Sequence, residues 1–111
     1  MINLENIRWT VMDLKANNIY LTQERWEHII NPMNHPEMSD YEEHLKKTIQ
    51  KGIRKQDVLN PNKYRYTLKF KDLTDYNTHI VAIVLFRFVS DENSRPLPNN
   101  YIVTAYQKEI G

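Results

Sequence analysis

The sequence predicts an α+β fold, with two N-terminal helices packed on a roughly four-stranded antiparallel β-sheet. Capping residues and helical spacing of apolar residues occur in the first half of the chain, whereas strand-like patterns dominate the second half. The length agrees with this, because 111 residues are typical of one domain and can bury a core without disulfides or metal. We therefore expect a single domain spanning residues 1–111.

The N-terminal segment has the features of a strand or hairpin that leads into a helix. Ile7–Leu14 is rich in β-branched and aromatic residues, and a Lys-Ala-Asn-Asn turn connects it to the short apolar run Ile19–Leu21. Thr22 is a predicted N-cap, because its hydroxyl can accept a hydrogen bond from the first helical turn. The helix should end before Pro32, since residues that precede proline are displaced from the helical region.

A second helix is predicted by the S-x-x-E pattern of Ser39–Glu42, a capping box in which each side chain can bind the backbone N–H of the other residue. Leu45 and Ile49 then recur at helical spacing. Gly52 is expected to end this helix. A linker that contains two prolines separates it from the first helix.

Three strand patterns follow the second helix, at Tyr64–Phe70, Ile80–Val89 and Tyr101–Gln107. Aromatic and cationic residues alternate along the first, which predicts one aromatic and one basic face. The second is apolar almost throughout, as is typical of a central strand, and Arg87 is its conspicuous exception.

Charge is unevenly distributed along the chain. Residues 46–71 contain nine Lys or Arg against one Asp or Glu, a net charge of +8, whereas residues 1–45 carry −5 and residues 72–111 carry −2. Such a block can bind nucleic-acid phosphates, or it can be an ordinary solvated helix and strand face. The candidate substrate-binding residues are Lys46, Lys47, Lys51, Arg65 and Lys69.

Composition excludes several kinds of site. The chain has no cysteine, which rules out disulfides, thiolate nucleophiles and cysteine-bound zinc and favours a cytoplasmic location. With two glycines it has no Gly-rich phosphate loop. It also has no long apolar run or signal-peptide pattern, so we expect no membrane association.

Two histidines are candidates for acid or base chemistry. His28 follows Glu24 by one helical turn, and His35 is separated from Glu37 by a proline, so each imidazole has a carboxylate within reach. Both are also consistent with ordinary surface histidines. These four residues could alternatively form the site of a metal-dependent hydrolase, but no metal-binding motif supports that, and we expect no metal or other cofactor.

The last strand supplies hydroxyl groups. Thr104 and Tyr106 are two residues apart and therefore share one face of the strand. A threonine hydroxyl can bind a phosphate, and a tyrosine can donate a proton or stack on a base. A strand with polar ends would show the same pattern.

The order of four motifs along the chain resembles that of a nuclease superfamily. The motifs are ERWEHI, NHPE, a capped basic helix and a terminal TAY strand, and together they span about Ile19 to Tyr106. They resemble the BECR superfamily of barnase, EndoU, colicin and RelE-like nucleases, in particular its small phage- and toxin-associated branch. The resemblance implies paired helices followed by a four-stranded antiparallel sheet, and metal-independent cleavage of RNA by 2′-hydroxyl attack on the adjacent phosphate.

The resemblance also assigns roles to residues. His28 of WEHI would be the acid or base, with His35 as an alternative, and Arg87 would bind the phosphate. Thr104 and Tyr106 of TAY would lie on the terminal strand of the site. The expected protein is an endoribonuclease toxin with an RNA substrate and an antitoxin partner; the alternative is a non-catalytic module that binds RNA or protein through the basic 46–71 surface.

Overall fold

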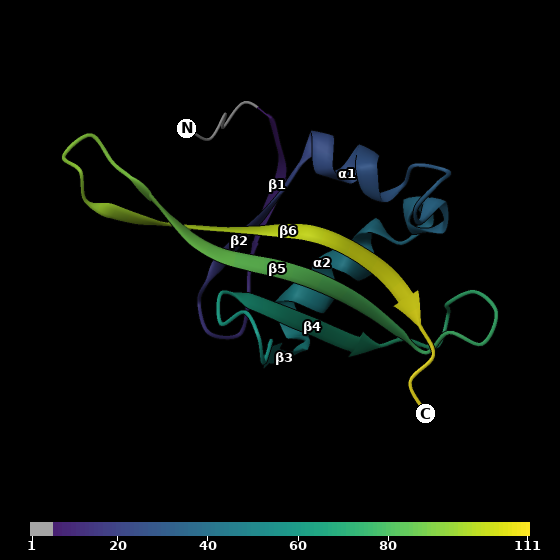
Figure 1. Ribbon diagram of the computed structural model, residues 1–111. Coiled ribbons are helices and arrows are strands. Elements are labelled where there is room, and N and C mark those ends of the chain that lie inside the picture. Colours follow the sequence, from purple (N-terminus) through teal and green to yellow (C-terminus); the bar gives the residue numbers. More distant parts are fainter. Residues whose placement is uncertain (1–5) are drawn as a thin grey trace.

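The computed structural model describes residues 6–111, which form six strands, two α-helices and a short 3-10 helix (Figure 1). In chain order the elements are β1 (Ile7–Met12), β2 (Asn18–Thr22), α1 (Gln23–Ile29), the 3-10 helix η2 (Pro36–Asp40), α2 (Glu42–Lys51), β3 (Ile53–Gln56), β4 (Lys63–Lys69), β5 (His79–Ser90) and β6 (Pro96–Lys108). No helix in this part of the chain has the length and hydropathy needed to cross a membrane.

The strands form one mixed sheet in the order β1-β2-β6-β5-β4-β3, in which β2 and β6 are parallel and the other neighbours are antiparallel. The chain is α+β, but the prediction of two N-terminal helices on a four-stranded antiparallel sheet was wrong. The hairpin β1–β2 precedes the helices and belongs to the same sheet. β3, with the sequence IRKQ, has no apolar alternation by which it could have been predicted.

The two helices begin differently. Thr22 caps α1 as predicted, and its Oγ1 accepts a hydrogen bond from the backbone N–H of Arg25 at 3.0 Å. The predicted capping box does not form, because Ser39 lies within η2 and α2 begins at Glu42 without a side-chain cap. Pro36 at the start of η2 favours this extra turn.

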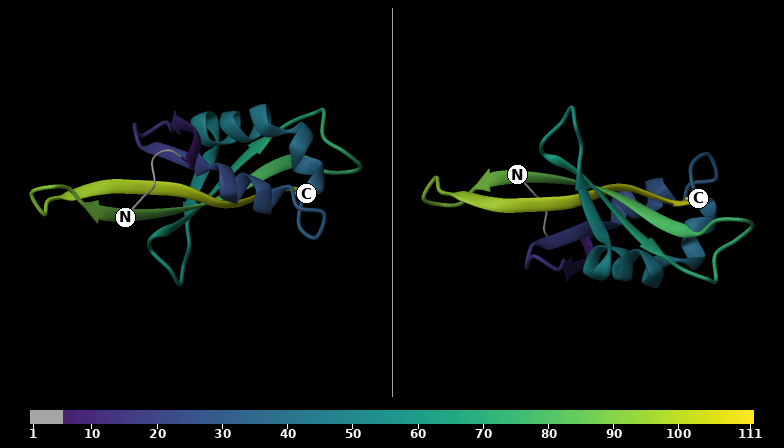
Figure 2. Two further views of the ribbon diagram at one scale, coloured as in Figure 1. Left: turned by 90° about the horizontal axis from the view of Figure 1, so that it is seen from above. Right: turned by 90° about the horizontal axis from the view of Figure 1, so that it is seen from below.

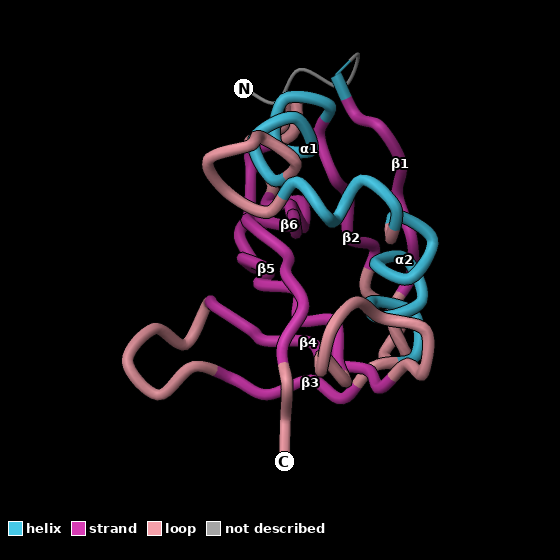
Figure 3. Tube along the Cα trace, turned by 90° about the vertical axis from the view of Figure 1, so that its right-hand side faces the viewer, coloured by secondary structure: helices cyan, strands magenta, loops and turns pink. Residues whose placement is uncertain are grey.

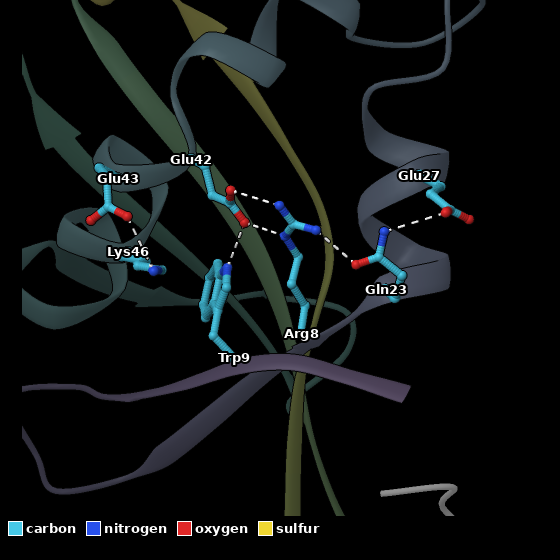
Figure 4. A network of polar contacts seen from close by, with 7 residues as sticks. All are labelled: Arg8, Trp9, Gln23, Glu27, Glu42, Glu43 and Lys46. Atoms are coloured by element: carbon cyan, nitrogen blue, oxygen red, sulfur yellow. Dashed lines mark hydrogen bonds and ion pairs between the residues drawn. The ribbon is translucent and has the colours of Figure 1, made fainter. Parts of the chain in front are cut away.

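The Glu42 side chain instead joins α2 to β1 (Figure 4). Its carboxylate accepts hydrogen bonds from the Arg8 guanidinium and, at 2.9 Å, from Nε1 of Trp9. The Arg8 hydrogen bond, assisted by that of Trp9, keeps the pKa of the Glu42 carboxyl below its usual value despite partial burial. Arg8 also donates to Gln23 of α1 at 2.7 Å, so one arginine ties β1 to both helices.

The core lies between the helices and one face of the sheet. α1 packs on β2 and β6, whereas α2 packs on β4 and β5 and also contacts β1, the strand at the opposite edge (Figure 3). The sheet must therefore curl around α2. The core residues from both layers are Ile19, Leu21, Trp26, Ile29, Met38, Tyr41, Leu45, Ile49, Tyr66, Ile80, Ala82, Val84, Ile102 and Ala105.

A buried hydrogen bond connects the two halves of the curled sheet. The Tyr66 hydroxyl on β4 donates to Oδ2 of Asp13, just after β1, at 2.6 Å. Burial by itself raises the pKa of the Asp13 carboxyl, but this bond and hydrogen bonds from Asn17 and Lys15 outweigh it and hold the pKa below its usual value. Burial, together with the Asp13 contact, raises the pKa of Tyr66, which stays a neutral donor.

The distal parts of β5 and β6 project from the body as a two-stranded arm (Figure 2). The arm comprises residues 88–90 of β5 paired with residues 96–98 of β6. It accounts for the elongated shape of the molecule, 50 × 27 × 23 Å along its principal axes.

The prediction that α2 ends at Gly52 is confirmed. Glycine is needed at this position because there is no space for a side chain. Its φ of −72° is accessible to any residue. A Cβ at this position would, however, lie 2.2 Å from the carbonyl oxygen of Thr48 and 2.8 Å from that of Thr67. Both oxygens belong to the backbone and cannot rotate out of the way as a side chain could. α2 and β4 can therefore lie this close together because the residue between them has no side chain.

Gly52→Ala should therefore destabilise the protein by about 1–3 kcal/mol, the usual cost of overpacking. Gly111→Ala is the matched control, because a Cβ there meets no atom within 4 Å. Urea unfolding measures both. Equal unfolding midpoints for Gly52→Ala and the wild type would contradict this close approach.

Asp13→Asn should lower the melting temperature at pH 7. It should also make the melting temperature fall less steeply as the pH is lowered. A carboxyl whose pKa is lowered by folding stabilises the protein above its unfolded pKa, about 3.9 for aspartate, and this stabilisation is lost as the pH falls through the folded pKa. Melting curves from pH 6 down to about pH 2 test this, with the exposed Asp40→Asn as control. An unchanged acid dependence in Asp13→Asn would show that this carboxyl is not linked to folding.

Candidate functional site

Polar and basic side chains of four strands gather on the outer face of the sheet, which we define as the side opposite the helical core. Residues paired across an antiparallel sheet point to the same side, so the register defines rows of neighbours on this face. In order the rows are Lys69-His79-Lys108, Ile53-Thr67-Val81-Tyr106, Lys55-Arg65-Ile83-Thr104, Lys63-Leu85-Tyr101 and Arg87-Asn99. None of these residues is acidic. We call the six basic members, Lys55, Lys63, Arg65, Lys69, Arg87 and Lys108, the outer stripe.

Arg65 and Thr104 lie in the same row, on either side of Ile83 of β5. With strands about 4.8 Å apart, their backbones are about 10 Å from each other, and Tyr106 is about 7 Å further along β6 than Thr104. A β-bulge next to Ile83 shifts the register between β5 and β6 at this point. Bulges are common beside active sites, where they change the direction of side chains.

Arg65 has a buried donor without a partner. Its Nε is enclosed, yet it makes no hydrogen bond with any of residues 6–111. An unpaired buried donor costs about 1–3 kcal/mol, and folded proteins seldom retain one without a reason. The Nε itself is enclosed and out of reach of a ligand, but Arg65 is partly exposed and lines a hollow of the outer face.

His35 reaches the same region from the segment between α1 and η2. Within the described residues, β2 pairs with β6 as far as Tyr20 and Tyr101, and η2 contacts β6 further along. The backbone N–H of His35 donates to Ile29 at 2.9 Å and positions the segment. The imidazole packs against the Tyr106 ring with centroids 5.5 Å apart.

The carboxylate predicted to accompany His35 is also present. Nδ1 of His35 lies 3.8 Å from Oε1 of Glu37, which is an ion-pair distance, although longer than a hydrogen bond. Both side chains are 38% exposed, so the imidazole can contact a ligand. His35, Glu37 and Tyr106 thus form one cluster beside the Arg65-Thr104 row.

The other predicted catalytic residues lie apart from this cluster. His28 is exposed on α1, where its carbonyl oxygen accepts from Nδ2 of Asn34, and its imidazole makes no hydrogen bond or ion pair with any of residues 6–111. Arg87 belongs to the outer stripe, but it lies at the base of the arm, four residues beyond Ile83 and therefore about 13 Å along β5. The structure therefore brings together His35, Thr104 and Tyr106 of the predicted catalytic set.

The predicted basic surface of residues 46–71 is divided between two sides of the molecule. Lys46, Lys47 and Lys51 are on α2, whereas Arg65 and Lys69 belong to the outer stripe. Lys46 is also engaged locally, since its Nζ lies 3.1 Å from Glu43 and 5.5 Å from the centre of the Trp9 ring. One ligand bound to the sheet would not contact the helix lysines.

One hollow lies on the outer face, and another lies at its edge, beside α1. One of ≈ 350 Å³ lies between α1, β2 and β6 and is lined by Arg25 and Tyr101, among others. The other, ≈ 240 Å³, is lined by Lys55, Lys63 and Arg65. Residues 6–111 contain no group of three His, Cys, Asp or Glu side chains that could hold a metal ion, so the four ligands considered from the sequence do not form a recognisable metal site.

Sequence reasoning missed Arg25, Tyr101 and part of the outer stripe. The period-two alternation of β4 could have shown that Lys63 shares a face with Arg65 and Lys69. In β6 the same alternation places Tyr101 opposite Thr104 and Tyr106, and only the β-bulge brings it to their face. Arg25 gave no comparable signal, because its place at the hollow depends on how α1 packs against β6.

Comparisons of the chain with protein-family models, curated proteins and solved structures found no match. The function must therefore be inferred from the outer face itself.

Arg65→Met should leave the free energy of unfolding unchanged or raise it, because the substitution removes a buried donor that has no partner. Arg8→Met should lower it, because it leaves the Glu42 carboxylate without its charged partner. Urea unfolding of the two variants provides the comparison. A larger loss in Arg65→Met than in Arg8→Met would mean that Arg65 is a structural residue.

Proposed function

We propose that the protein is a metal-independent endoribonuclease that binds RNA across the outer face of its sheet. The observation that carries this proposal is that Arg65 lies in one row with Thr104, beside the His35-Tyr106 pair. These are groups of the kinds that phosphodiester cleavage needs: a cation, a hydroxyl and an imidazole that can transfer a proton.

The outer stripe favours a polyanion as the ligand. Six basic residues follow one face of the sheet, and no acidic residue occurs in the same rows. Such an arrangement attracts phosphates along an extended path, and the binding weakens as salt rises. An extended single strand of RNA matches a stripe that crosses several strands, and aromatic residues on the same face can stack on its bases.

The cluster supports cleavage by transfer of the phosphate to the neighbouring ribose oxygen. His35 removes the proton of the 2′-hydroxyl, and the 2′-oxygen forms a bond to the adjacent phosphorus. Arg65 and the Thr104 hydroxyl bind the non-bridging oxygens, on which negative charge increases. The bond from phosphorus to the 5′-oxygen breaks, and Tyr106 donates a proton to that oxygen. The products are a 2′,3′-cyclic phosphate and a free 5′-hydroxyl.

This assignment chooses between the two histidines that the sequence left open. His35 packs against Tyr106 on the outer face, whereas His28 is exposed on α1. Arg87 is too far along β5 to bind the same phosphate as Arg65, so we assign it to a neighbouring part of the RNA. Lys46, Lys47 and Lys51 are not included in this RNA path.

A ribonuclease that acts on cellular RNA would work in the cytoplasm and would need an inhibitor. The resemblance to small toxin-associated nucleases and the basic outer stripe both agree with a toxin that an acidic antitoxin covers. The competing proposal is a non-catalytic module that uses the same face to hold RNA. It differs in leaving the phosphodiester bonds intact.

Purified protein should cleave total cellular RNA in EDTA and leave 2′,3′-cyclic phosphate ends. His35→Ala and Arg65→Ala should lower the rate by about 10² to 10⁴, the usual contribution of an acid, base or charge-stabilising group. His28→Ala is the matched control and should retain nearly full activity, provided that its melting temperature is unchanged.

Two results would reject parts of this proposal. Salt-dependent RNA binding without cleavage, weakened by Arg65→Ala, would identify the non-catalytic module. Loss of activity in His28→Ala but not in His35→Ala would move the acid or base to α1.

A further inference from the structure

The arm projects from the body of the protein (Figure 2) and has no part in the proposed cleavage chemistry. Within the described residues, β4 pairs with β5 only as far as Leu85 and β2 pairs with β6 only as far as Asn100, so no third strand flanks the arm. Phe88, on the arm, is 70% exposed. A lone two-stranded ribbon is marginally stable in water, whereas a third strand stabilises it. The free edges of the arm are therefore candidate positions for a strand from another chain.

The backbone of β5 leaves hydrogen-bond donors on its free edge. The N–H of Phe86 points away from β6 and donates to the carbonyl oxygen of Asn62 at 2.7 Å. Because successive residues of a strand alternate in direction, the N–H and C=O groups of Phe88 and Ser90 also point away from β6. No partner for these two N–H groups is present among residues 6–111. This edge of the arm can therefore pair with a further strand.

The free edge of β6, in contrast, lacks donors. Pro96 and Pro98 are opposite Ser90 and Phe88 in the ladder, so the proline nitrogens also point away from the ribbon. Proline has no N–H, and prolines on an edge strand hinder its pairing with other chains. The arm is thus protected on one edge and open on the other.

The open edge of β5 is complementary to a second copy of itself. Two such strands can pair antiparallel about a twofold axis at Val89, which places Phe88 of each copy opposite Ser90 of the other. In this register Arg87 of each copy is opposite Asp91 of the other. Oδ1 of Asp91 accepts from backbone N–H groups of the turn, whereas Oδ2 makes no hydrogen bond within residues 6–111 and can accept from an arginine. An axis at Phe88 or at Ser90 would separate these opposite charges, so charge favours the axis at Val89.

We propose that the protein dimerises through this edge, so that the β5 strands of two arms join two sheets into one. The twofold axis of an antiparallel pair is perpendicular to the sheet, and the outer faces of both copies therefore lie on the same side. Dimerisation does not depend on the proposed chemistry. Arg87 can take part in both, because a guanidinium has several N–H donors and can bind Asp91 and an RNA phosphate together.

A cysteine placed on the axis tests the contact directly, because the chain has no cysteine of its own. In the proposed dimer the two Val89→Cys side chains face each other across a pair whose Cα atoms are about 4.5 Å apart, which permits a disulfide. Leu97→Cys is the matched control, since Leu97 is opposite Val89 in the same arm but would be about 14 Å from its counterpart. Mild oxidation should form covalent dimers at least about tenfold faster with Val89→Cys. Equal rates would overturn the proposal.

Sedimentation of the wild type from about 1 µM to about 1 mM covers the range of weak association and should show a monomer–dimer equilibrium. Ser90→Pro removes a free N–H from the edge and should weaken dimerisation at least about tenfold. Ser90→Ala is its matched control, because it changes the side chain and keeps the N–H.

Unchanged melting temperatures would show that both Ser90 variants keep the arm intact, and if Ser90→Pro melts earlier, the disulfide rates decide. A wild type that stays monomeric throughout this range would overturn the proposal and leave the edge to a strand of another protein. Equal dimerisation of correctly folded Ser90→Pro and Ser90→Ala would also overturn it.

Discussion

The curl of the sheet around α2 is the constraint on which the rest of the structure depends. It brings Asp13, after the edge strand β1, within hydrogen-bonding distance of Tyr66 on β4, although three strands separate these two in the sheet. The helices then fill the inner side, and Arg8 and Glu42 hold β1 against them. Because the hydrophobic core lies on the inner side, the outer face can carry charged and polar residues.

The charged residues of the outer face differ from Asp13 and Glu42 in that they are all basic and have no acidic residue in the same rows. Asp13 and Glu42 have their partners within the chain, and their hydrogen bonds lower the pKa of each carboxyl. The basic residues of the outer stripe, in contrast, have no acidic residue in their rows. A buried donor without a partner occurs on both faces, at Nε of Arg65 and at Nε2 of Gln107, which pairs with the core residue Ile80. The excess of positive charge is therefore the physical basis for locating the site on the outer face.

The candidate site could be predicted in part. Alternation in a strand was sufficient to place Thr104 and Tyr106 on one side, and to separate aromatic from basic residues along β4. The choice between His28 and His35 could not be made, since both had a carboxylate at suitable spacing. The charge block of residues 46–71 suggested one surface, yet the turn at Gly52 sends its helix and its strands to different sides of the molecule.

The sequence by itself determined the α+β class, the cap at Thr22, the end of α2 at Gly52 and the three long strands, because each depends on neighbouring residues and on the period of the backbone. Tertiary structure alone decided the six-stranded order, the parallel contact of β2 with β6 and the position of His35 beside Tyr106. Those contacts join segments about 70–80 residues apart. They result from how the sheet curls and what it must cover, which no local pattern encodes.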